Sequence, residues 1–117
     1  MAAPNVVNVA TITAKTAVQL VLNSHASIVT NASSSNKVFK VNALYISNVD
    51  GTSSADVDVS VLRGGVYYHI AKTVSVPADS TLDVLSKSVY LEEGDALCTL
   101  ASAASDLEAV CSYEEIS

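Results

Sequence analysis

The residues best suited to acid–base or metal chemistry near neutral pH are the two histidines, His25 and His69. They are not in H-x-H or H-x-x-x-H spacing, so no local metal site is predicted. His69 falls on a predicted strand, diagonally near Asp58 of the facing strand, where a His–Asp pair could form the core of a catalytic dyad. We favour the plainer interpretation, which is a cross-strand pair on the surface.

The other reactive residue types form no recognisable constellation. No serine lies in a G-x-S-x-G context. Calcium loops use a D-x-D-x-D-G pattern, which is absent, so solvated carboxylates are the favoured interpretation of the acidic residues. These residues are Asp56, Asp58, Glu92, Glu93 and Asp95. We therefore expect a protein that is not an enzyme and that binds no cofactor and no metal.

Two cysteines, Cys98 and Cys111, are too few for a disulfide framework. If Ala96–Ala101 and Leu107–Glu115 form a closing hairpin, the two thiols face each other and a disulfide is sterically possible. The N-terminus has neither a basic n-region nor a long apolar core, so we expect no signal peptide and synthesis in a cytoplasm. In that compartment buried free thiols are favoured over a disulfide.

Composition predicts one domain with little charge. The chain has 117 residues, half of them hydrophobic, and a net charge of −6, and a domain of this size can fold without a metal or a disulfide. The six basic residues are scattered singly, so the basic stripe that nucleic acid or an anionic membrane would require is missing. No stretch approaches the ~18 apolar residues of a membrane helix. We expect neither nucleic acid nor membrane as a partner.

The element that organises the chain is a predicted hairpin from Asp56 to Thr73, turning at Gly64–Gly65. Glycine tolerates the positive φ angles of tight primed turns, and a glycine pair between two strands is not a phosphate loop. The simplest register opposes Val61 with Tyr68, Val59 with Ile70, Ser60 with His69, and Asp58 with Ala71. The first two pairs predict a core face. Asp58, Leu62, Tyr67 and His69 lie on the other face, as a contact patch.

Short apolar runs separated by turn signals predict further strands along the rest of the chain. Their expected ranges are 6–13, 16–23, 26–31, 38–49, 81–85, 88–91, 96–101 and 107–115. Range 16–23 also fits a short helix, although its β-branched content favours a strand. Within 38–49 the apolar phase changes near Ala43, which indicates a bulge or a strand buried on both faces. We predict an all-β antiparallel β-sandwich, jelly-roll-like, of about 8–10 short strands, with residues 1–5 as an N-terminal arm and 6–117 as one domain.

Three segments together resemble a known group of proteins. They are K-V-F-K-V-N-A-L-Y-I-S-N-V-D-G (37–51), V-P-A-D-S-T-L-D-V-L-S-K (76–87), and Y-L-E-E-G-D-A-L (90–97) followed by A-S-A-A-S-D-L-E-A-V-C-S-Y-E-E-I (101–116). Their order and spacing resemble small β-sandwich virion structural proteins of tailed bacteriophages, notably those infecting cyanobacteria. The most specific piece is L-x-x-G-D-x-L at 91–97, a strand–turn–strand corner.

The resemblance implies a role in the virion, assembled in the host cytoplasm through contacts with capsid or other virion proteins. A capsid decoration or cement subunit, acting as a homo-oligomer such as a trimer, is the first hypothesis. The alternatives are a neck, tail or fibre accessory protein, and a virion carbohydrate-binding module that uses outward tyrosines such as Tyr67 and Tyr68 for host attachment. Strand edges left unpaired would be covered by symmetric assembly. Candidate interface residues are Leu62, Tyr67, His69, Leu97 and Val110.

Overall fold

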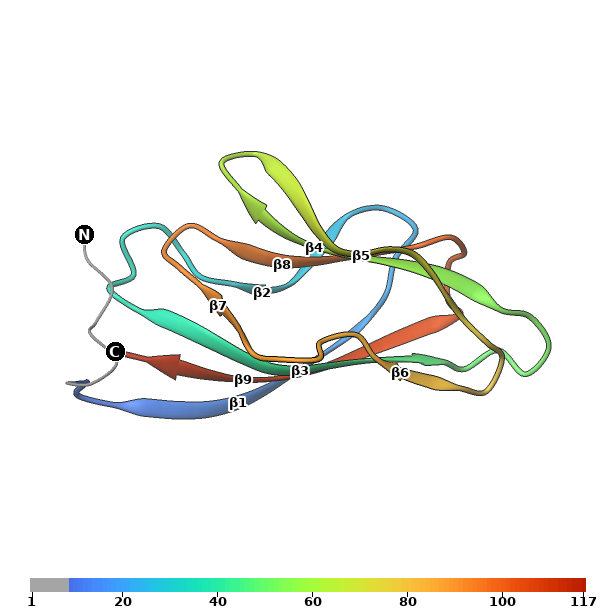
Figure 1. Ribbon diagram of the computed structural model, residues 1–117, viewed down its shortest axis with the longest axis horizontal. Coiled ribbons are helices and arrows are strands. Elements are labelled where there is room, and N and C mark those ends of the chain that lie inside the picture. Colours follow the sequence, from blue (N-terminus) through green and yellow to red (C-terminus); the bar gives the residue numbers. More distant parts are fainter. Residues whose placement is uncertain (1–8) are drawn as a thin grey trace.

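The computed structural model describes residues 9–117. This part of the chain forms nine β-strands and contains no helix (Figure 1). The strands are β1 (Ile12–Leu20), β2 (Ala26–Thr30), β3 (Val38–Asn48), β4 (Ala55–Arg63), β5 (Val66–Val76), β6 (Thr81–Asp83), β7 (Val89–Leu91), β8 (Ala96–Ala101) and β9 (Leu107–Ile116). The expected arm at 1–5 lies outside the described residues. Because the described part holds no helix, nothing in it could serve as a membrane-spanning helix.

The strands form two antiparallel sheets packed face to face (Figure 1). Sheet A has the order β1-β9-β3-β6, with β7 also pairing with β3, and sheet B has the order β2-β8-β4-β5. Most connections cross from one sheet to the other, and β6 and β7 lie along the same neighbour, β3. This arrangement confirms the predicted β-sandwich with a jelly-roll-like strand order.

The core between the sheets consists mainly of aliphatic side chains of modest size. Its largest fully buried members are Leu44, Ile46, Leu91, Leu97 and Leu107, accompanied by several valines. Two sheets about 10 Å apart need side chains that interdigitate, and Val and Leu do so without large rings. The scarcity of Phe and the absence of Trp in the sequence therefore do not prevent a closed core.

The long central strand β3 contains the predicted bulge. Its register with β9 shifts between Val41 and Ala43, which is where the apolar phase changes in the sequence. Phe39 and Val41 face the core before the shift, and Leu44 and Ile46 face it afterwards. The bulge adds one residue to the strand and so reverses the alternation. As a consequence, Tyr45 faces outward and is 43% exposed.

The central hairpin exists, but its predicted register is right only near the turn. Gly64 and Gly65 have φ of 61° and 78°, and Val61 pairs with Tyr68 as expected. Farther from the turn, β5 has more residues than β4, and the register shifts on each side of Val59. Two further predicted pairs, Val59 with Ile70 and Asp58 with Ala71, are therefore wrong, because Val59 pairs with Ala71.

The bulges also change which part of the hairpin belongs to the core. Bulges strengthen the local twist, and Figure 1 shows the turn end of the β4–β5 hairpin rising away from the other strands. Tyr68 and Ile70, predicted as core residues, are 59% and 39% exposed. The buried part of β4 is the section around Val57 and Val59. The hairpin is thus core at its base and surface at its tip.

Two other expectations about strand pairing are wrong. The expected ranges 6–13 and 16–23 imply a break at residues 14–15, but β1 runs without interruption through Ile12–Leu20. The closing hairpin does not form either, because β8 lies in sheet B and β9 in sheet A. Cys98 therefore faces Ser60, whereas Cys111 faces Leu44. Both thiols are buried and free, as the cytoplasmic interpretation favoured.

Candidate docking surface

The residues that could perform chemistry are not brought together. His69 lies opposite Ser60 on the exposed surface of the hairpin. The carboxylate of Asp58 accepts a hydrogen bond of 2.6 Å from the backbone N–H of Thr73 and lies 3.7 Å from the ammonium of Lys72. Asp58 thus stabilises the β5 bulge and forms no dyad. Among residues 9–117, no group of three or more His, Cys, Asp or Glu side chains could hold a metal ion.

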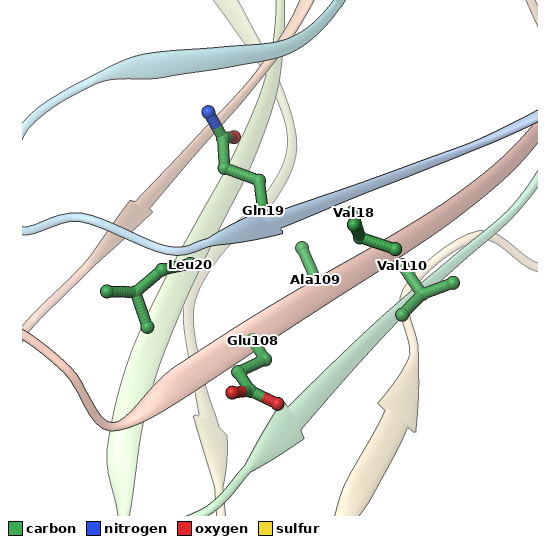
Figure 2. Close-up of a pocket in the computed structure, with 6 residues that line it drawn as sticks. All are labelled: Val18, Gln19, Leu20, Glu108, Ala109 and Val110. Atoms are coloured by element: carbon green, nitrogen blue, oxygen red, sulfur yellow. The ribbon is translucent and has the colours of Figure 1, made fainter.

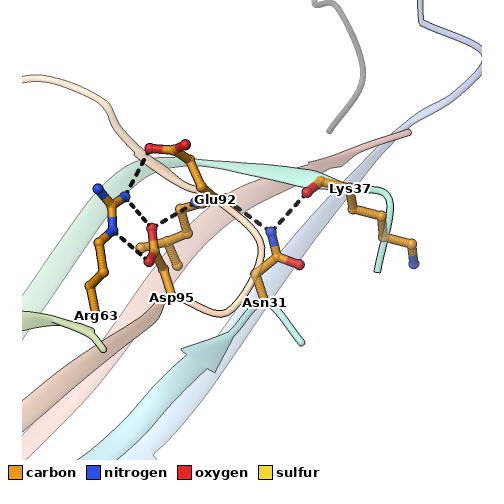
Figure 3. Close-up of polar contacts among 6 residues, drawn as sticks. Asn31, Lys37, Arg63, Glu92 and Asp95 are labelled. Atoms are coloured by element: carbon orange, nitrogen blue, oxygen red, sulfur yellow. Dashed lines mark hydrogen bonds and ion pairs between the residues drawn. The ribbon is translucent and has the colours of Figure 1, made fainter. Parts of the chain in front are cut away.

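Most of the acidic residues that were considered as metal ligands instead form local hydrogen bonds or ion pairs. Arg63, at the end of β4, donates from Nε and Nη2 to the two carboxylate oxygens of Asp95, at 2.8 and 2.5 Å, and reaches Glu92 at 2.9 Å (Figure 3). This guanidinium holds the pKa of Asp95 below its ordinary value, and Asp95 in turn raises the pKa of Arg63. Asp95 also accepts from the backbone N–H of Glu92. The cluster joins the β4–β5 turn to the β7–β8 turn.

A buried asparagine completes the same corner. The Asn31 side chain donates to the backbone carbonyls of Lys37 and Leu91, at 2.9 and 3.0 Å (Figure 3). The backbone carbonyl of Asn31 accepts a hydrogen bond from Gly94 N–H, and Gly94 has a φ of 87°. Each defined position of the L-x-x-G-D-x-L corner thus has a structural role: Gly94 forms the turn, Asp95 is a buried carboxylate, and Leu91 and Leu97 are core residues. It is a structural element.

The five candidate interface residues do not share one surface. Leu97 is fully buried in the core, so its assignment as an interface residue is wrong. Val61, which pairs with Leu97, packs against that core from the same face of sheet B. Leu62 and Tyr67 are half-buried on the opposite face, and His69 is exposed there. The Tyr67 ring is already stacked on His25, with ring centroids 3.9 Å apart.

Val110 belongs to a different surface, on the outer face of sheet A. It lies directly opposite Val18 of β1 on one side and Tyr45 of β3 on the other. Opposed residues project to the same face of a sheet, so these three side chains form a continuous row across three strands. Their exposed fractions are 73% for Val18, 38% for Val110 and 43% for Tyr45. We call this set the apolar row.

The surroundings of the apolar row suit contact with another protein. The adjacent cross-strand row is small, with Thr16, Ser112 and Ala43. On the other side, Leu20 and Glu108 border an open hollow that Val18 and Val110 also line (Figure 2). Figure 2 also shows Gln19 pointing the other way, where it donates to the carbonyl of Ser27 at 3.2 Å. The outer face is therefore partly apolar and bordered by polar groups, as protein interfaces are.

A second hollow lies between the two sheets at the tip of the hairpin. It has a volume of about 360 Å³ and is lined by Val61, Arg63, Tyr68 and Tyr90. Tyr68 comes from β5 and Tyr90 from β7, and they are 59% and 48% exposed. Tyr67 and Tyr68 were predicted to act together in glycan binding. They lie on opposite faces of the sheet, because Tyr67 pairs with Leu62 and Tyr68 pairs with Val61.

Sequence reasoning found Val110 but missed Val18 and Tyr45. A signal for Tyr45 was present, because the phase change near Ala43 places Leu44 and Ile46 inward and therefore Tyr45 outward. No comparable sequence signal marks Val18, because its place in the apolar row depends on its pairing with Val110. That pairing joins β1 and β9, the first and last strands of the described residues. Long-range register of this kind is not written in local periodicity.

Comparisons with known proteins show the fold. No protein-family model and no curated protein matches the chain. Among solved structures, a chain from the capsid of Helicobacter pylori bacteriophage KHP30 is similar with a TM-score of 0.59 at 11% identity, covering 94% of this chain and 90% of that one. A chain from the disulfide-linked pili of Bacillus endospore appendages is similar with a TM-score of 0.54 at 19% identity, covering 92% and 88%.

Proposed function

We propose that this protein is a non-enzymatic structural subunit of a tailed-bacteriophage virion, and that it decorates the capsid through protein–protein contacts made by the outer face of sheet A. The observation that carries the proposal is the apolar row of Val18, Val110 and Tyr45. An apolar set spanning three strands on an exposed sheet face is typical of an interaction site. The reactive side chains of the described residues are engaged in local structure or stand apart, which agrees with a structural role.

The two similar solved structures support assembly as the general role and differ in what they suggest about it. One is a capsid and the other a disulfide-linked pilus. In this chain both cysteines, Cys98 and Cys111, are at most 1% exposed, so neither is placed to bridge to a neighbouring subunit. The chain therefore fits the capsid comparison better than the disulfide-linked one. The three sequence segments that resemble virion proteins of tailed phages point in the same direction.

The direct experiment is to bind the purified chain to phage particles that lack it and to sediment the mixture. We expect the chain to co-sediment with assembled heads and not with unassembled coat protein. Val110→Lys introduces a charge at the centre of the apolar row and should reduce binding about tenfold or more, since a buried unpaired charge is costly. The matched control is Ser75→Lys, on the exposed edge strand of the other sheet.

The outcomes separate the proposal from its nearest competitors. Equal binding by Val110→Lys and Ser75→Lys would show that the apolar row is not the docking surface. Binding to isolated necks, tails or fibres in place of heads would identify an accessory protein of those parts. Imaging of the labelled chain on intact particles gives the same distinction independently.

A carbohydrate-binding role is the second candidate, because the hollow with Tyr68 and Tyr90 offers it a site. Two exposed tyrosines around a shallow space, with a fixed guanidinium beside them, can stack on a sugar and hydrogen-bond its hydroxyls. Screening the chain against host-surface glycans tests this role. Tyr68→Ala and Tyr90→Ala should each abolish any binding that belongs to this hollow, whereas Val110→Lys should leave it unchanged.

A further inference from the structure

Among residues 9–117, the two sheets have four edges, and three of them are poorly suited to pairing with another chain. The edge of sheet A opposite β1 consists of β6 and β7, which have three residues each. In sheet B, β2 has five residues and a register shift between Ser27 and Val29. Short strands and irregularities are the usual protection against unwanted edge pairing.

The remaining edge of sheet B, β5, is long but irregular. It carries the extra residues that shift the register around Val59. Thr73 within it has a φ of 54°, a left-handed conformation that a β-branched residue rarely adopts. Such a residue interrupts the row of outward N–H and C=O groups that a new strand would need. β5 is therefore protected in spite of its eleven residues.

β1 has none of these protections. Its nine residues pair with β9 in an unbroken register from Ile12–Ile116 to Leu20–Glu108, and it contains no proline or glycine. Its one charged residue, Lys15, is turned back onto its own sheet, where its ammonium lies 2.9 Å from Glu115. Within residues 9–117 this regular, nine-residue edge is left open, and such an edge is a template for another strand.

The sequence of β1 is complementary to itself when two copies run antiparallel. The register that pairs all nine residues has its two-fold axis at Thr16, the midpoint of the strand. On the outer face, Ile12 then pairs with Leu20 and Ala14 with Val18, each twice by symmetry, and Thr16 pairs with Thr16. On the other face Thr13 meets Gln19 and Lys15 meets Ala17. On the outer face apolar residues oppose apolar ones, and no like charges are opposed on either face.

Neighbouring registers are less favourable. Moving the two-fold axis to Ala17 leaves Ile12 and Thr13 without a partner in β1 and places Val18 opposite Thr16. Moving the two-fold axis to Lys15 places the two lysines directly opposite each other, which is unfavourable. The Thr16 register also extends the apolar row, because Val18 would face Ala14 of the second copy. The two apolar rows would then lie on one shared outer face, one on each side of the Thr16 pair, and each row would end on Ala14 of the other copy.

We propose that β1 is a homodimerisation edge: two copies of this chain join their A sheets through antiparallel β1–β1 pairing about a two-fold axis at Thr16. The contact is isologous and closes at two copies, which replaces the trimer expected from the sequence with a dimer. It leaves the outer face of sheet A uncovered, so it does not rest on the docking role proposed above.

The test measures association by sedimentation equilibrium over a dilution series. The wild-type chain should show a reversible monomer–dimer equilibrium. Thr16→Lys and Thr16→Glu each place like charges opposite each other at the axis, and each should raise the dimer dissociation constant about tenfold or more. A mixture of the two variants places Lys opposite Glu and should restore dimerisation as a heterodimer. Ser75→Lys, on the protected edge β5, should dimerise like the wild type.

Each outcome decides the question. A wild-type chain that stays monomeric at all concentrations, or that forms trimers, overturns the proposal. So does a Lys–Glu mixture that remains as monomeric as its components. Thermal unfolding of each variant checks that folding is intact, and Thr16 is exposed in the monomer, so both charges should be tolerated. A monomeric chain that still binds phage heads would overturn the pairing alone, whereas a dimer that binds nothing would overturn the docking role alone.

Discussion

Arg63 and Asp95 form a bidentate polar link between separate parts of the fold, because the Arg63 guanidinium contacts both carboxylate oxygens of Asp95. Asp95 is only 1% exposed, whereas the Arg63 side chain is 54% exposed. The pair ties the tip of the β4–β5 hairpin, which rises from the sandwich, to the turn that leads into β8. Without it the hairpin tip would rest on few contacts with sheet A.

Substitution of Asp95 should destabilise the fold. Asp95→Ala removes the acceptor of both Arg63 bonds and of the Glu92 N–H, and we expect a loss of about 2 kcal/mol in the free energy of unfolding. Arg63→Gln should also destabilise, because it leaves a buried carboxylate without its cation. Lys72→Gln is the control, since the Lys72 side chain is 67% exposed and its 3.7 Å contact with Asp58 should contribute no more than about 0.5 kcal/mol. Urea unfolding of the three variants measures the differences, and equal effects at Asp95 and Lys72 would contradict the argument.

Acid should reduce stability through the same carboxylates. The pKa of Asp95 is lowered from 3.8 by its hydrogen bonds with Arg63, and the pKa of Glu115 is lowered from 4.5 by its hydrogen bond with Lys15. A carboxylate whose pKa is lower when folded stabilises the protein above its unfolded pKa, and this contribution is lost as pH falls through the folded value. We expect the melting temperature to fall below about pH 4.5. Asp95→Asn should fall less steeply over that range, and a slope unchanged by this variant would show that Asp95 does not contribute.

The glycine turn of the central hairpin gives a test of backbone conformation. Gly65 has a φ of 78°, and a Cβ placed there would meet nothing within 4 Å, so the cost of Gly65→Ala is purely conformational. We expect a loss of about 1 kcal/mol in the free energy of unfolding. Gly51→Ala is the matched control, because Gly51 lies in a loop without a positive φ and its new Cβ would make ordinary contact with Asp79 at 3.6 Å. It should be neutral within about 0.5 kcal/mol.

Local sequence patterns correctly predicted the structural features that depend on neighbouring residues. The glycine turn, the phase change near Ala43 and the strand extents of β8 and β9 all appear in the structure, because each depends on residues close together in the chain. The β-sandwich followed from strands of this number and length. The free state of both thiols was likewise favoured correctly.

The errors arose where pairing joins distant segments. Ala96–Ala101 and Leu107–Glu115 alternate as a hairpin would, yet the chain crosses between the sheets at residues 102–106 and sends them to different layers. Leu97 therefore faces the core and Val110 faces solvent, although both were expected to be interface residues. The bulges of β5 were not predicted for a related reason, because an extra residue can be recognised only from its pairing with the opposite strand.

Thiol labelling tests the placement of the cysteines. Burial raises the pKa of the Cys111 thiol to about 11, and since the thiolate is the reactive form, Cys111 should react very slowly at pH 8. Cys98 is shielded by its 1% exposure. We expect both thiols to be unreactive with a maleimide in the native protein and both to react in denaturant. Fewer than two reactive thiols after unfolding without reductant would indicate a disulfide and contradict the structure.

Leu97 and Val110 provide the sharpest test of which strand faces lie inside. Leu97 is fully buried among core residues, so Leu97→Ala should leave a cavity and cost about 3 kcal/mol in the free energy of unfolding. Val110 is 38% exposed, so Val110→Ala should cost about 0.5 kcal/mol, within the range of surface substitutions. If β8 and β9 formed one hairpin with both residues on its outer face, the two variants would have similarly small effects. Urea unfolding therefore separates the two arrangements by the cost of Leu97→Ala alone, and the small cost at Val110 leaves its variants free to report on docking.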